Sequence, residues 1–106
     1  MSNKIKDILS EYVEGLIKII GKDLKKVILY GSYARGDYRK DSDIDVAVVV
    51  PKSSISKNIL DDMAKLFKLR RNICTDIEPV LIIDEDDASG FLESISKYGE
   101  IVWSMS

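Results

Sequence analysis

Residues 30–50 read YGSYARGDYRKDSDIDVAVVV, and this stretch decides the fold because it joins two apolar runs through a polar loop. The first run is VILY at residues 27–30, and the second is IDVAVVV at residues 44–50. Short apolar runs rich in β-branched residues are typical of buried strands. Because Gly31 and Ser32 follow the first run directly, the sequence predicts that the polar residues of this stretch gather at strand ends.

Two aspartates, Asp43 and Asp45, lie two residues apart at the start of the second run. In a strand this spacing places both side chains on one face, roughly 7 Å apart along the backbone. Two carboxylates on one face repel unless a cation lies between them, and Mg²⁺ prefers such hard oxygen ligands. Aspartates at a strand edge can also be solvated caps, so the pair alone leaves its function open.

The composition indicates one domain over residues 1–106, since a chain of 106 residues forms one core but not two. The net charge is -2, so we expect no direct binding of nucleic acid. The absence of histidine excludes zinc–histidine sites and histidine acid–base catalysis, and the single Cys74 cannot form an internal disulfide. No segment resembles a secretory signal or a membrane span, so we expect a cytoplasmic protein without membrane contact.

Hydrophobic periodicity predicts helices and strands in alternation. In the first half of the chain we expect a helix over residues 5–20 that ends at Gly21, a strand over 27–30, a helical turn over 33–35 and a strand over 44–50. In the second half we expect a helix from the cap residues Ser53 and Ser54 as far as Ile73 and a strand over 76–83. A helix that ends at Gly99 and a strand over 101–103 complete the domain. The buried stripe of the first helix should include Ile17, and Trp103 should pack in the core.

These elements predict an α/β domain with one small mixed sheet covered by helices. The link over residues 32–42 is too short for a full crossover, so the first two strands should be antiparallel. Pro79 lacks a backbone donor, which indicates an edge strand or a bulge. The acidic run DEDD at residues 84–87 is more simply the first turn of a helix than a metal site, and Lys22, Lys25 and Lys26 are more simply a solvated turn than a guide for anions.

Gly31 lets the backbone approach a ligand closely, and Ser32 opens a helical turn whose free N–H groups and hydroxyl would hold phosphate oxygens. A third carboxylate should accompany the aspartate pair. The third strand offers Asp76 and Glu78 on one face, and Glu78 is favoured because it lies further into the apolar strand, where a buried acid needs a partner.

Gly31-Ser32, ten intervening residues and Asp43-Ile44-Asp45 resemble the GSx10DxD signature of the minimal nucleotidyltransferases, in the DNA polymerase β-like superfamily. GSYARGD and SDID match as they stand, and IEPV at residues 77–80 resembles the strand that carries the third carboxylate. The resemblance implies Mg²⁺-dependent transfer of a nucleoside monophosphate, most often AMP from ATP, to a hydroxyl. Members of this size are similar to the antitoxins of HEPN/MNT toxin-antitoxin pairs, some of which adenylylate a tyrosine of the HEPN toxin.

By that resemblance, Gly31 and Ser32 hold the triphosphate, Asp43 and Asp45 bind both of two Mg²⁺ ions, and Glu78 completes one ion and helps to activate the acceptor hydroxyl. This assigns the catalytic and metal-binding roles to three carboxylates and the nucleotide-binding roles to the turn.

Arg35 either contacts phosphate or pairs with Asp37 or Asp41, and Tyr33 and Tyr38 either stack on the base or are exposed loop residues. Three functions remain open: an enzyme with a HEPN protein as acceptor, an enzyme for a small molecule or an RNA end, and an antitoxin that neutralises its partner by binding alone. Three acidic ligand positions disfavour the last of these.

Overall fold

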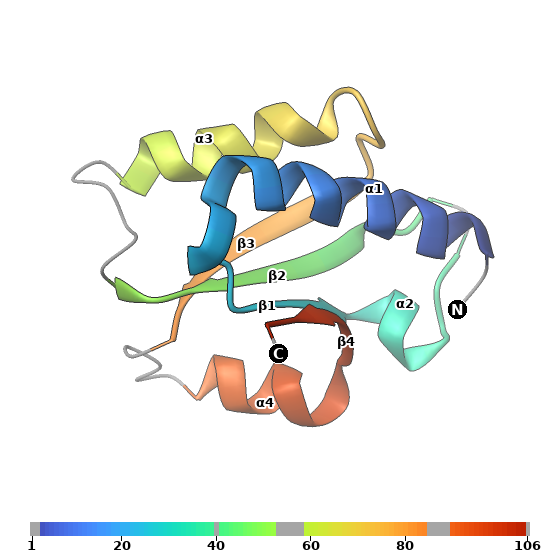
Figure 1. Ribbon diagram of the computed structural model, residues 1–106. Coiled ribbons are helices and arrows are strands. Elements are labelled where there is room, and N and C mark those ends of the chain that lie inside the picture. The colour runs from blue at the N-terminus through green and yellow to red at the C-terminus, as the bar shows by residue number, and fades with distance from the viewer. Residues whose placement is uncertain (1–2, 40, 53–58, 85–89, 106) are drawn as a thin grey trace.

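The computed structural model describes residues 3–39, 41–52, 59–84 and 90–105 (Figure 1). The elements, in chain order, are α1 (Asn3–Ile20), the short 3-10 helix η1 (Gly21–Asp23), β1 (Lys26–Tyr30), α2 (Ser32–Arg35), β2 (Ile44–Val50), α3 (Ile59–Arg70), β3 (Ile77–Ile83), α4 (Phe91–Tyr98) and β4 (Glu100–Ser104). Within the described ranges, no helix is both long and apolar enough to cross a bilayer.

The four strands form one mixed sheet in the order β3-β2-β1-β4. β1 pairs with β2 and with β4 in antiparallel fashion, and β2 pairs with β3 in parallel. The predicted α/β class, mixed sheet and antiparallel first pair are therefore confirmed. β3 is an edge strand, which accommodates Pro79 as predicted.

Helices cover both faces of the sheet (Figure 1). One face packs against α1 and α3 through a core that includes Val46, Val48 and Val50, whereas Ala47 and Val49 face α4. Since β2 is buried on both faces, its sequence is apolar at every position after Asp45. Strand alternation places Asp45 on the face that α4 covers.

A buried hydrogen bond joins the two helices on the first face. The hydroxyl of Tyr12 on α1 donates to the carbonyl oxygen of Leu66 on α3 at 3.0 Å. Burial raises the pKa of Tyr12 far above its ordinary value, although Arg70 partly opposes this, so the hydroxyl stays a donor. This bond fixes the position of α3 against α1.

Some expectations were wrong in detail. Ile17 is 40% exposed, because the buried face of α1 is centred on Leu9, Tyr12 and Leu16 and Ile17 lies beyond its edge. Ile73 follows the end of α3 at Arg70 instead of belonging to the helix.

The acidic run after β3 is also placed differently where it is described. Asp84 lies in a turn, and α4 begins only at Phe91, after Gly90 with a φ of 74°. A positive φ is not helical backbone, so Asp84 does not open the helix. Residues 85–87 lie outside the described residues, as do the predicted caps Ser53 and Ser54. Trp103 is half-buried and packs against the core under α1.

The turn between β1 and α2 requires glycine. Gly31 has φ 75° and ψ -151°, which side chains rarely tolerate, and its carbonyl accepts from the amide of Arg35 at 3.1 Å. A Cβ on Gly31 would collide with the carboxylate of Asp45. The short helix ends at Gly36, whose φ is 85°. The Gly-Ser turn therefore lies directly against Asp45.

We expect Gly31→Ala to lower the free energy of unfolding by about 3 kcal/mol, at the upper end of the cost of strained backbone, because it adds both strain and a collision with Asp45. Gly36→Ala is the matched control: its φ is also positive, but nothing lies within 4 Å of the new Cβ, so it should cost about 1–2 kcal/mol. Chemical denaturation measures both. Equal losses would show that contact with Asp45 contributes nothing.

Candidate active site

Three side chains form a row across three neighbouring strands. The backbone register pairs Tyr30 on β1 with Asp45 on β2, and Asp45 with Glu78 on β3. Neighbouring strands lie about 4.8 Å apart, so this register brings the two carboxylates close together on the face that carries α4. Asp43 directly precedes β2 and is exposed. The structure thus gathers the three predicted carboxylates at one end of the sheet.

The charges in this row act on Asp45. Burial raises the pKa of Asp45, the carboxylates of Asp43 and Glu78 raise it further, and Arg35 partly opposes them. Two acidic groups therefore act on one carboxylate that has lost part of its water. A cation that enters such a site lowers its free energy, because it offsets the repulsion between the carboxylates.

The donor set fits a hard cation. All three predicted ligands offer carboxylate oxygens, which suit Mg²⁺ better than the softer metals that select sulfur or imidazole. Yet among the residues that the structure describes, no three acidic or cysteine side chains stand close enough to form a ready metal cluster. Glu78 has a partner of its own, because its Oε1 accepts a hydrogen bond from Nη1 of Arg70 at 3.0 Å.

Asp76, the alternative third carboxylate, lies in different surroundings. One of its carboxylate oxygens is 4.0 Å from Sγ of Cys74, and its backbone carbonyl accepts from the amide of Ile44. Burial raises the pKa of Tyr33, and Asp76 adds to this rise. Asp76 therefore contributes to the raised pKa of Tyr33, whereas Glu78 contributes to the raised pKa of Asp45.

The polar residues around the turn are paired in this structure. Nε of Arg35 donates to Oδ2 of Asp37 at 3.2 Å, and both side chains are largely exposed. Exposed ion pairs of this kind contribute little to stability. Tyr33 and Tyr38 stack on each other, with ring centroids 4.3 Å apart. Of the alternatives for Arg35, the pair with Asp37 is the one formed here.

A groove opens beside the Gly-Ser turn, with a volume of about 440 Å³. It is lined by Tyr30, Gly31, Arg35, Ser94, Ile95, Tyr98 and Gly99. The groove thus extends from Tyr30 and the Gly-Ser turn to residues of α4, which gives a ligand room next to the turn.

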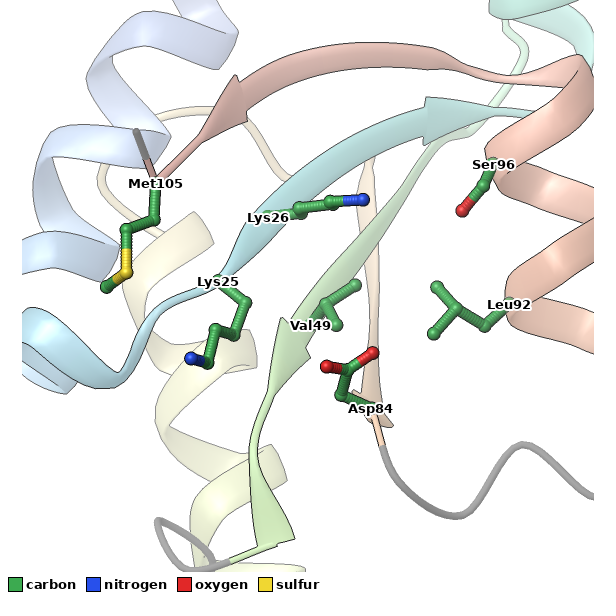
Figure 2. Close-up of a pocket in the computed structure, with 7 residues that line it drawn as sticks. All are labelled: Lys25, Lys26, Val49, Asp84, Leu92, Ser96 and Met105. Atoms are coloured by element: carbon green, nitrogen blue, oxygen red, sulfur yellow. The ribbon is translucent and has the colours of Figure 1, made fainter.

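A second hollow, of about 270 Å³, lies on the same face at the other end of the sheet (Figure 2). Lys26 extends across it toward α4, whereas Lys25 points away, and Asp84 lies at its edge. Lys26 is four residues from Tyr30 along β1, which is roughly 13 Å in a strand. These lysines are therefore not part of the carboxylate row.

Two residues of this site did not stand out in the sequence. Tyr30 faces the carboxylates. Burial raises the pKa of its hydroxyl, and the charges of Asp45 and Glu78 raise it further, so the hydroxyl remains a proton donor at neutral pH. Its ring packs edge-on against Phe91 at 5.6 Å. Strand alternation from Asp45 could have placed Tyr30 once the strand register was known. The second residue is Arg70, and nothing in the sequence indicates its contact with Glu78.

We expect Asp45→Asn to raise the melting temperature at neutral pH without divalent cations. Because the pKa of Asp45 is raised in the folded state, its charged form destabilises the fold above that pKa, and the penalty disappears as the pH falls through it. The gain from the amide should therefore shrink on acidification. Asp41→Asn, in the exposed loop, is the control and should change little. A lower melting temperature for Asp45→Asn would contradict the repulsion described here.

Comparison with known proteins identifies the fold and the family. The model of the family "Nucleotidyltransferase domain" matches residues 3–102. The chain is 32% identical over 98 residues to "Putative protein adenylyltransferase MJ0141" of Methanocaldococcus jannaschii, which covers 91% of this chain and 96% of the relative. It is 35% identical over 86 residues to MJ1305 of the same organism, with 77% of this chain and 57% of that protein covered.

Solved structures share the fold. A chain of a toxin-antitoxin crystal structure with AMP-PNP superimposes with a TM-score of 0.65 at 20% identity, covering 99% of this chain and 76% of the other. A chain of the tri-AMPylated Shewanella oneidensis HEPN toxin in complex with MNT antitoxin gives a TM-score of 0.61 at 17% identity, covering 94% and 73%. With a domain match over most of its length and a relative aligned nearly end to end, the chain belongs to the nucleotidyltransferase domain family.

Proposed function

We propose that this chain acts as one domain that transfers AMP from ATP to a tyrosine hydroxyl of a HEPN-type partner, with two Mg²⁺ ions, and so serves as an antitoxin. The observation that carries this function is the contact between the Gly-Ser turn and Asp45, in register with Glu78. It places a turn suited to phosphate beside carboxylates suited to a cation. The name of MJ0141 supports a protein as acceptor, and the HEPN toxin complex supports the class of partner.

Each residue has a role in this reaction. Gly31 admits the triphosphate close to the backbone, and the hydroxyl and amide groups at Ser32 hold its oxygens. Asp43, Asp45 and Glu78 supply the oxygen ligands. When bound, two Mg²⁺ ions would neutralise charge that develops on the attacking and leaving oxygens.

The acceptor hydroxyl forms the new bond to the α-phosphorus, the bond to pyrophosphate breaks so that pyrophosphate leaves, and the hydroxyl proton passes to solvent. Glu78, as a ligand of one cation, would help to activate that hydroxyl. Arg35 lies at the groove beside the turn and is suited to contact a phosphate when it leaves Asp37. Transfer of this kind depends mainly on position and electrostatics. The described residues form one sheet with its helices, and in this proposal the partner orients its own hydroxyl.

Mixing the protein with Mg·ATP and the protein encoded by the neighbouring gene should add one or more AMP units to the latter, as measured by intact-mass spectrometry. We expect Asp43→Asn and Asp45→Asn each to slow the transfer by roughly 100-fold or more, the loss typical of removing one electrostatic stabiliser. Asp41→Asn is the matched control and should remain active. If the variant that carries both Asp43→Asn and Asp45→Asn neutralises the partner equally well, and the partner gains no mass, the protein acts by binding alone.

The third carboxylate is tested separately. Glu78→Gln should slow AMP transfer by a similar factor, since Glu78 is in register with Asp45, whereas Asp76→Asn should change it little because Asp76 precedes β3 and is not paired with Asp45. Initial rates at saturating Mg·ATP distinguish the two. Loss of activity in Asp76→Asn alone would show that Glu78 is not the ligand.

A further inference from the structure

Arg70, the last residue of α3, holds the edge of the sheet next to the carboxylates. Its Nη1 donates to the carbonyl oxygen of Ile77 at 2.7 Å and to Oε1 of Glu78 at 3.0 Å. An edge strand leaves alternate carbonyls without a strand partner, and Arg70 satisfies the one at Ile77. One guanidinium group therefore binds both the backbone of β3 and the side chain of Glu78.

The guanidinium of Arg70 is held from the helix side as well. It lies over the ring of Phe67, one turn earlier on α3, with 4.7 Å between its central carbon and the ring centroid. α3 itself is fixed to α1 through Tyr12 and Leu66. The side chain is 24% exposed, so little freedom is left to it. Its position is thus set before any ligand binds.

Glu78 has little else among the described residues to hold it in place. Its side chain is 42% exposed, Asp45 lies beside it on the neighbouring strand β2, and Tyr30 lies one strand further away on β1. The carboxylate of Asp45 repels it. Without Arg70, the free energy of Glu78 would be lowest when its carboxylate turns into solvent, away from Asp45.

We propose that Arg70 is a positioning residue, which binds one oxygen of Glu78 and thereby presents the other oxygen to the cation site beside Asp45. This rests on the proposed function, because it assigns Glu78 as a ligand. A carboxylate ligand is commonly oriented by a hydrogen bond of this kind, and loss of the partner typically weakens metal binding 10–100-fold. The guanidinium suits the task because the two N–H groups of its Nη1 point in fixed directions and reach both acceptors at once.

The test measures Mn²⁺ affinity by calorimetry, with a non-hydrolysable ATP analogue present, so that the readout does not depend on turnover. We expect Arg70→Gln to weaken Mn²⁺ binding by about 10–100-fold. Arg71→Gln is the matched control, because Arg71 is the next residue, carries the same charge and is exposed. It should bind Mn²⁺ like the natural protein.

A double-mutant cycle separates positioning from a general structural role. If Arg70 acts through Glu78, then Arg70→Gln should have no further effect on Mn²⁺ affinity in a Glu78→Gln background. An equal loss in that background would overturn the inference, as would unchanged or tighter binding by Arg70→Gln alone. Tighter binding would mean that Arg70 competes with the cation.

Arg70→Lys keeps the charge and provides a second variant if Arg70→Gln fails to fold. Lysine lacks the fixed, planar N–H directions of Nη1, so we expect Arg70→Lys to bind Mn²⁺ several-fold more weakly than the natural protein, and to make no difference once Glu78 is Gln. Affinity equal to that of the natural protein would then overturn the inference. If the natural protein binds neither Mn²⁺ nor the nucleotide analogue, the proposed function fails and the role of Arg70 fails with it. If it binds both and only the Arg70 variants behave unexpectedly, the proposed function stands.

Discussion

The backbone pairing of β2 with β1 on one side and β3 on the other is the constraint on which the rest of the structure depends. It buries a Val-rich strand between two layers of helices and sets which residues share a row. The same hydrogen bonds that complete the core therefore align Tyr30, Asp45 and Glu78. The site requires no separate scaffold, because the sheet that stabilises the chain also fixes the spacing of its carboxylates.

Much of this could be predicted from the sequence, because the strongest signals are local. The apolar run at residues 44–50, the glycine after residue 30 and the short link between them specify two antiparallel strands without knowledge of any distant contact. Pro79 marked an edge strand for a similarly local reason, its missing donor. The spacing of Asp43 and Asp45 likewise follows from strand geometry alone.

What could not be predicted depends on contacts between segments or on small rotations of a helix. The exposure of Ile17 follows from how α1 is rotated against the sheet, and periodicity does not set that angle to within one residue. The contact between Arg70 and Glu78 joins a helix end to the next strand across a turn, and many arginines near helix ends make no such contact. Tyr30 could be placed beside Asp45 only when the pairing of β1 with β2 was known.

The apolar sequence of β2 has a consequence for strand alignment. Residues 46–50 read VAVVV, so a slip by one residue would exchange similar apolar side chains between the two faces, and the hydrophobic effect alone would barely oppose it. Asp45 changes this balance, because the same slip would turn a carboxylate into the core beneath α1 and α3, which is lined by hydrophobic side chains in the described part of the chain. Asp45 thus specifies the register of β2, because a chain with the strand slipped by one residue would have to bury a charged carboxylate.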